Sequence, residues 1–156
     1  KEREKVLNRR RAEIANDSHA ALMVRLHCDS STQSGYACYF PDRMGTAQGK
    51  TGPTAEIQSR SKSAAESIVK AMESALMGKL VSGGVRGDSK TLIGGKQGAL
   101  TGSIFSEVPV ITIEMVVLNN KSDAAFIKSK DGPKLLASAI AEGIRFFVEN
   151  DRKADK

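Results

Sequence analysis

Two side chains of this sequence have chemical types that could act on a substrate. His27 ends the apolar run "ALMVRLH" of residues 21–27, and it is one of only two histidines. Glu114 is the single carboxylate in "VITIEMVV", residues 110–117. An imidazole can bind a metal ion, and a carboxylate can bind one or transfer a proton. Because an isolated buried carboxylate is costly, Glu114 is expected to be paired, protonated, near a metal or at the mouth of a cleft.

Each of these side chains also has a purely structural interpretation. A zinc site normally needs three or four protein ligands, and the only other histidine is His19. Glu114 could form a structural ion pair with Arg25 or Arg86. Residue types alone therefore favour structural roles over catalytic ones.

Strands are predicted to position His27 and Glu114. Alternating side chains indicate strands at residues 20–27 and 35–40, and the apolar segment 110–117 is typical of a strand covered on both faces. Ligands of such sheets gather beyond the carboxyl ends of the strands. We therefore expect both side chains to face one crevice.

Helices are predicted from periodicity and capping residues at residues 3–17, 63–80, 121–129 and 131–150. Ser63 and Glu66 have the spacing of a capping box, and "SGG" at 82–84 is expected to end that helix. Ser122 is expected to cap the third helix. With the strands, these helices predict an α/β fold, a single mixed, mostly parallel sheet with helices on both faces, in one domain over residues 1–156.

Two segments between these elements are polar or rich in glycine. Residues 41–60 form a long polar connection. The stretch 83–102 has no phosphate-binding glycine motif, so its glycines are expected to form tight turns around a cleft, with a short strand at 91–93.

The composition of the chain limits the kinds of partner that it is expected to bind. The 24 basic and 18 acidic residues give a net charge of +6, which favours an anionic partner. Nucleic acid is disfavoured because the chain has two tyrosines and no tryptophan for stacking. No apolar run is long enough for a membrane span, and any export signal must lie outside this sequence. Cys28 and Cys38 are expected to be isolated buried thiols rather than a disulfide.

Five segments together resemble the zinc-dependent N-acetylmuramoyl-L-alanine amidases of bacterial cell walls, of the amidase 3 type. In that family an arginine and an Ala-Asn pair precede a strand that ends in histidine, and a later strand carries a glutamate followed by asparagine. The corresponding residues are Arg10 or Arg11, Ala15, Asn16, His27, Glu114 and Asn120. The segments are "RRRAEIANDSHAALMVRLHCDS", "SGYACYF", "GGVRGDSKTLIGG", "VPVITIEMVVLNNKSDAAFI" and "LLASAIAEGIRFF".

The resemblance implies a function. Members of the family hydrolyse the amide between N-acetylmuramic acid and L-alanine of peptidoglycan, using zinc as cofactor. By similarity, His27 would be a zinc ligand and Glu114 the catalytic glutamate. The implied partners are the glycan strand with its stem peptide and a regulatory protein, and the implied location is the periplasm or cell wall.

The sequence also departs from the family pattern. Two further zinc ligands, a histidine in a glycine-rich turn and a glutamate on the next helix, would lie upstream of Lys1. We therefore expect an N-terminally incomplete catalytic domain that binds zinc weakly and could be inactive alone. Val116 and Val117 replace the Gly-Phe that usually follows the glutamate. The alternative is a degenerate, non-catalytic peptidoglycan-binding or regulatory domain of the same fold.

Overall fold

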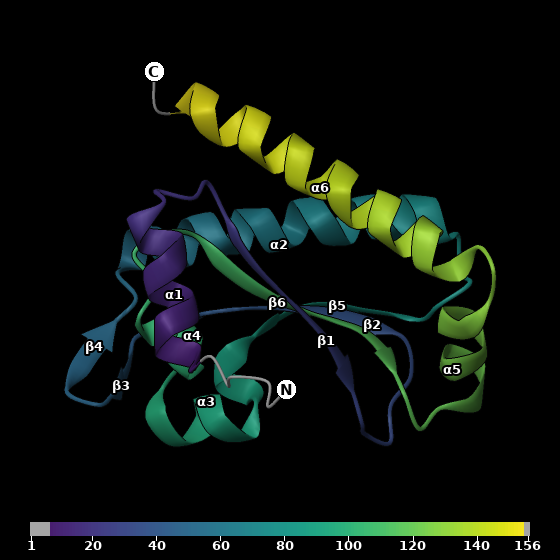
Figure 1. Ribbon diagram of the computed structural model, residues 1–156, viewed down its shortest axis with the longest axis horizontal. Helices are drawn as coiled ribbons and strands as arrows, with labels where there is room; N and C mark the ends of the chain where they lie inside the picture. The colour runs from purple at the N-terminus through teal and green to yellow at the C-terminus, as the bar shows by residue number, and fades with distance from the viewer. Residues whose placement is uncertain (1–6, 155–156) are drawn as a thin grey trace, which may run out of the picture.

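A four-stranded sheet forms the centre of the computed structural model, which describes residues 7–154 (Figure 1). The strand order is β1-β6-β2-β5, in which the β1/β6 and β2/β5 pairs are parallel and the β6/β2 pair is antiparallel. The sheet is therefore mixed and mostly parallel, as predicted. Its strands are β1 (Met23–Asp29), β2 (Tyr36–Phe40), β5 (Ser82–Gly87) and β6 (Val110–Val117).

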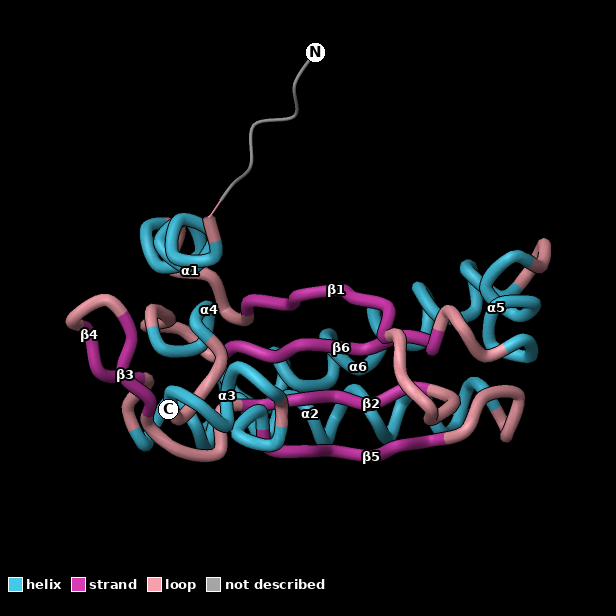
Figure 2. The backbone as a smooth tube through the Cα atoms, turned by 90° about the horizontal axis from the view of Figure 1, so that it is seen from below, coloured by secondary structure: helices cyan, strands magenta, loops and turns pink. Residues whose placement is uncertain are grey.

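Helices cover both faces of this sheet, which confirms the predicted fold class. The long helices α2 (Ala55–Leu76) and α6 (Gly132–Ala154) pack together on one face. The short helices α3 and α4 lie on the opposite face, and α5 lies at one end of the sheet (Figures 1 and 2). The remaining elements are α1 (Asn8–Asp17), the hairpin of β3 (Gly45–Ala47) and β4 (Lys50–Gly52), a 3₁₀ turn (Asp88–Lys90), α3 (Leu92–Gln97), α4 (Thr101–Ile104) and α5 (Lys121–Lys128).

The main hydrophobic core lies between β6 and the α2/α6 layer. Ile111 and Ile113 of β6 are fully buried there, as are Ile68 and Met72 of α2. Burying a side chain of this size contributes about 1.5–3 kcal/mol. A smaller cluster joins α1 to α4 and its flanks through Ala12, Ala99, Ile104 and Phe105. The apolar side chains of β6 that face α2 and α6 are thus buried in the main core.

Helices α2 and α6 approach each other closely at Gly143. A Cβ atom at this position would lie 2.5 Å from the Cα atom of Ile68. No side chain tolerates such a contact with a neighbouring backbone, so glycine is required for this helix spacing.

The predicted bounds of α2 are wrong at both ends. The helix begins at Ala55, where the Thr54 side chain accepts a hydrogen bond from Ile57 N, and not at Ser63. The first two turns carry mainly polar side chains, so they lack the apolar stripe that marks a helix in sequence. The helix ends at Leu76, and Met77 adopts a left-handed conformation with φ 45°.

Three other local predictions need correction. The "SGG" segment predicted as a helix stop begins β5, because its backbone pairs with β2. Residues 91–93 begin helix α3 rather than a strand, since the Thr91 side chain accepts from Gly94 N as a cap. The cap of α5 is Asn120 rather than Ser122. The first helix, predicted over residues 3–17, begins at Asn8 in the structure, and residues 3–6 lie outside the described part of the chain.

The two cysteines differ in environment, although both are free. Cys38 is buried in the main core, and burial raises its pKa to about 12. Cys28 is exposed on the edge strand β1, so the prediction of two buried thiols is wrong for Cys28. None of the helices in the described part of the chain combines the length and apolar character needed to cross a membrane.

Candidate active site

His27 and Glu114 lie side by side. They are register partners in the parallel β1/β6 pair, and His27 Nδ1 lies 3.8 Å from Glu114 Oε1. The register of the two strands shifts immediately afterwards, between His27 and Asp29. Irregularities of this kind are common next to functional sites, because they redirect side chains. The sequence prediction that both side chains face one crevice is therefore consistent with the structure.

The crevice is a cleft of about 400 Å³. Its floor is formed by the strands, and its wall comes from the segment 91–101, within the glycine-rich stretch that was expected to turn around a cleft. It lies on the face of the sheet opposite the α2/α6 layer. The lining residues are Asn8, Arg25, His27, Asp29, Tyr39, Thr91, Leu92, Ile93, Leu100, Thr101, Thr112 and Glu114.

The environment shifts the protonation of both side chains. Burial raises the pKa of Glu114, and the negative charge of Asp29 raises it further. Burial lowers the pKa of His27, with smaller contributions from the positive charges of Arg25 and Arg11. His27 is therefore mostly neutral at pH 7, so its 3.8 Å contact with Glu114 is not an ion pair at that pH. Glu114 Oε2 is buried and has no hydrogen-bond partner among the described residues.

The two arginines considered as structural partners of Glu114 have other contacts. Arg25 Nη2 donates a hydrogen bond to Ser103 Oγ at 2.9 Å. Arg86 donates to Gln33 Oε1 and to the carbonyl oxygen of Gly83. Within residues 7–154, neither pairs with Glu114, so the structural interpretation of this carboxylate loses its support.

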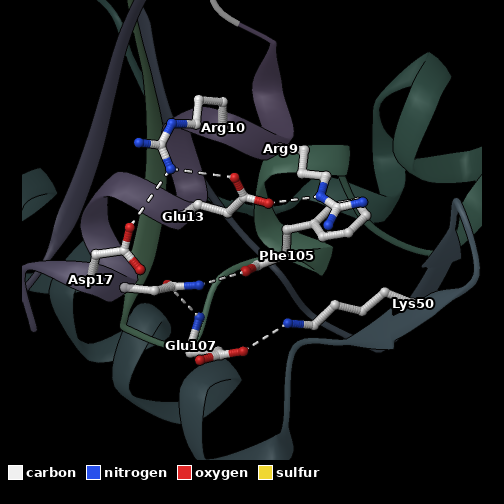
Figure 3. Close-up of polar contacts among 8 residues, drawn as sticks. Arg9, Arg10, Glu13, Asp17, Lys50, Phe105 and Glu107 are labelled. Atoms are coloured by element: carbon white, nitrogen blue, oxygen red, sulfur yellow. Dashed lines mark hydrogen bonds and ion pairs between the residues drawn. The ribbon is translucent and has the colours of Figure 1, made fainter.

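The segment that leads into β6 is held by Asn16. The Asn16 side chain donates to the carbonyl oxygen of Phe105 at 2.9 Å and accepts from Glu107 N at 2.8 Å. Ion pairs surround this contact, and Arg9 lies 5.2 Å from the centre of the Phe105 ring (Figure 3). The Ala-Asn pair seen in the sequence therefore has a positional role. It joins α1 to the strand that carries Glu114.

Replacing Asn16 with alanine is expected to destabilise the fold by about 1–3 kcal/mol, because it leaves a carbonyl group and an N–H group without their partner. Urea unfolding followed by circular dichroism measures the change. Asp17→Ala is the matched control on the same helical turn. Within the described residues the Asp17 side chain forms one exposed contact, with Arg10 at 3.6 Å, so its loss should cost at most about 1 kcal/mol. Equal destabilisation by both variants would contradict this role for Asn16.

The other end of β6 is held by Asp123, a residue that the sequence analysis did not single out. Asp123 is buried, and its Oδ2 accepts from Gly35 N at 2.6 Å and from Val117 N at 3.0 Å. Asn120 caps the same helix by accepting from Ser122 N and Asp123 N. The signal that the sequence offered for Asp123 was its position beside Ser122 at the start of a predicted helix. Asp123 thus ties β6 to the loop before β2.

Comparison with known proteins places this arrangement in a family. The sequence model described as N-acetylmuramoyl-L-alanine amidase, Amidase_3, matches residues 1–145. The chain belongs to this amidase family. No curated protein sequence matches this amidase-family chain.

Solved structures share the fold of this amidase-family chain. The N-acetylmuramoyl-L-alanine amidase from Clostridium difficile 630 has 20% identity and a TM-score of 0.71, with 92% of this chain and 66% of that chain covered. For Ami1 from Mycobacterium smegmatis the values are 21%, 0.70, 96% and 65%. For AmiC2 of Nostoc punctiforme they are 19%, 0.69, 93% and 67%. The chain thus spans about two thirds of the length of these structures.

A zinc site needs three or four ligands from His, Cys, Asp or Glu side chains, and this amidase-family chain offers two such side chains in the cleft next to each other. His27 offers a neutral imidazole, and Glu114 offers an unpartnered carboxylate oxygen beside it. However, no three His, Cys, Asp or Glu side chains gather within metal-binding reach in the described part of the chain. Because zinc needs at least three protein ligands, the described residues do not complete a zinc site.

Proposed function

We propose that the protein is a peptidoglycan hydrolase that cleaves the amide between N-acetylmuramic acid and L-alanine. Family membership over residues 1–145 supports this reaction class. The observation that carries the proposal is Glu114, which lies in a cleft of about 400 Å³ and has a raised pKa. Its buried Oε2 has no partner within residues 7–154. A carboxylate in this state is suited to proton transfer.

The proposed role of Glu114 follows from the chemistry of amide hydrolysis. Glu114 accepts a proton from the attacking water while the water oxygen forms a bond to the amide carbon. It then gives that proton to the leaving nitrogen as the C–N bond breaks. The partial burial that raises the Glu114 pKa strengthens it as a base and keeps the proton available for the amine.

Zinc is proposed as the cofactor, with His27 as one ligand. The lowered pKa of His27 keeps its imidazole in the neutral form that a ligand requires. When bound, zinc would polarise the amide and acidify a water molecule. The described residues do not complete its coordination, so the proposal requires two ligands in addition to those that residues 7–154 offer.

The 156-residue chain is expected to bind zinc only weakly, and to lose it during gel filtration, because one imidazole and one carboxylate cannot hold the ion tightly. Metal analysis of the eluted protein measures the ratio of zinc to protein. The naturally expressed protein is analysed in parallel, together with an assay of muropeptide release. One tightly held zinc on the 156-residue chain would contradict the expectation.

The proposed partner is the glycan strand with its stem peptide, and the proposed location is the periplasm or cell wall. The net charge of +6 favours association with an anionic wall. A regulatory protein is a further proposed partner. One structural relative, the CwlD amidase from Clostridioides difficile, was solved in complex with the GerS lipoprotein, at 18% identity and a TM-score of 0.65.

A second candidate function is a non-catalytic peptidoglycan-binding or regulatory domain. It is favoured by the lack of a three-ligand metal group among residues 7–154. The same assays separate the two functions. Zinc near one per molecule with muropeptide release supports the hydrolase, whereas a metal-free, inactive protein that still sediments with peptidoglycan supports the binding domain.

A further inference from the structure

Arg25 lines the cleft from strand β1. It is the register partner of Thr112 in the β1/β6 pair, and Thr112 in turn is the partner of Tyr39 in β2. These three residues form one row across the sheet and line the cleft. His27 and Glu114 form the next row. Residues two apart on a strand are separated by about 6.6 Å, which sets the spacing between the rows.

The guanidinium of Arg25 has little of its hydrogen-bonding capacity in use. Its Nη2 donates to Ser103 Oγ, and the Ser103 hydroxyl donates to Asp88 Oδ2 at 2.8 Å. Asp88 is near enough for its charge to act on Arg25, but the two side chains form no direct ion pair within the described residues. Arg25 Nε is buried and has no partner among the described residues. Because a guanidinium has five N–H donors, a buried one with so few partners retains binding capacity for an anion.

Thr112 adds a second unused group in the same row. It is 4% exposed, and its Oγ1 has no hydrogen-bond partner within the described residues. The guanidinium of Arg25 carries a positive charge at pH 7. The row therefore combines a fixed cation with a hydroxyl donor, a combination that suits a planar carboxylate.

We propose that Arg25 and Thr112 form a carboxylate subsite, which binds the residue that follows L-alanine in the peptide of the substrate. This inference rests on the proposed function. If the scissile amide lies at the His27–Glu114 row, an extended peptide reaches its second residue after about 7 Å, which matches the spacing of the rows. Arg25 would thus select substrates by the charge of that residue.

Binding of two synthetic probes tests the subsite. One probe is N-acetylmuramoyl-L-alanyl-D-glutamate with a free α-carboxylate, and the other carries a primary amide in place of that carboxylate. Titration calorimetry on the naturally expressed protein, made with Glu114→Gln to prevent turnover, is expected to show about 10-fold or greater preference for the free carboxylate. Arg25→Gln should abolish the preference, and Arg25→Lys should retain part of it.

Two further variants keep the test decisive. Thr112→Val removes a hydroxyl that has no partner in the described part of the chain, so it should fold normally while reducing the preference. Arg145→Gln is the matched control, since Arg145 lies on α6, on the face of the sheet opposite the cleft, where it pairs with Glu142 and Glu149, and it should leave the preference unchanged. Equal affinity for both probes would overturn the subsite and leave the proposed function standing. Binding of neither probe would overturn both.

Discussion

Replacing Glu114 with glutamine is expected to lower kcat/KM for muropeptide release by about 100- to 10 000-fold, the range associated with a general acid–base group. Glutamine preserves the size of the side chain but cannot take a proton from water. The fold should not suffer, because the substitution removes a carboxylate whose Oε2 is buried without a partner among the described residues. Chromatography of released muropeptides measures the rate, and thermal unfolding measures the stability.

Glu107→Gln is the matched control for this prediction. Glu107 lies in the loop before β6, is exposed, and pairs with Lys50 at 2.8 Å. Its substitution also removes one carboxylate charge, but Glu107 does not line the cleft, so the rate should change little. If Glu114→Gln released muropeptides as fast as the unmodified protein, Glu114 would not be the proton-transfer group.

Replacing Asp123 with alanine is expected to destabilise the fold by about 3–5 kcal/mol. Its single Oδ2 accepts from two buried N–H groups, those of Gly35 and Val117. Each orphaned donor costs about 1–3 kcal/mol, and bonds to a charged acceptor lie at the upper end of the range. Urea denaturation at neutral pH measures the change in the free energy of unfolding.

Two substitutions control for this effect. Asp123→Asn keeps an oxygen that can accept both bonds, so it should lose clearly less stability than the alanine variant. Glu66→Ala removes an exposed carboxylate in the middle of α2, and it should change stability by no more than about 0.5 kcal/mol. A loss below about 1 kcal/mol for Asp123→Ala would show that the two N–H groups find other partners.

Sequence reasoning succeeded where one local pattern determines the structure. Strand β6 has the predicted bounds, because its run of apolar side chains is interrupted only by Thr112 and Glu114 and one face is buried in the main core. The proximity of His27 and Glu114 was also foreseen, but the two residues are register partners inside β1 and β6 and do not end these strands, since β1 continues to Asp29. The α6 helix was evident because its apolar positions follow the helical period.

Sequence reasoning failed where distant segments supply the partner. Asn16 bonds to Phe105, which is 89 residues away, and Gly35 bonds to Asp123 over 88 residues. Strand β5 begins in a glycine-rich stretch of low strand propensity and is defined by its pairing with β2. The exposure of Arg25 to the cleft likewise depends on a register that no local pattern contains.

The close crossing of α2 and α6 limits how this chain can diverge. Most core positions can change if a neighbouring side chain changes volume to compensate. Gly143 has no such freedom, because its neighbour is the Cα atom of Ile68, which every amino acid possesses. A substitution at residue 68 therefore cannot rescue a larger residue at 143. Any lineage that loses this glycine must move a whole helix.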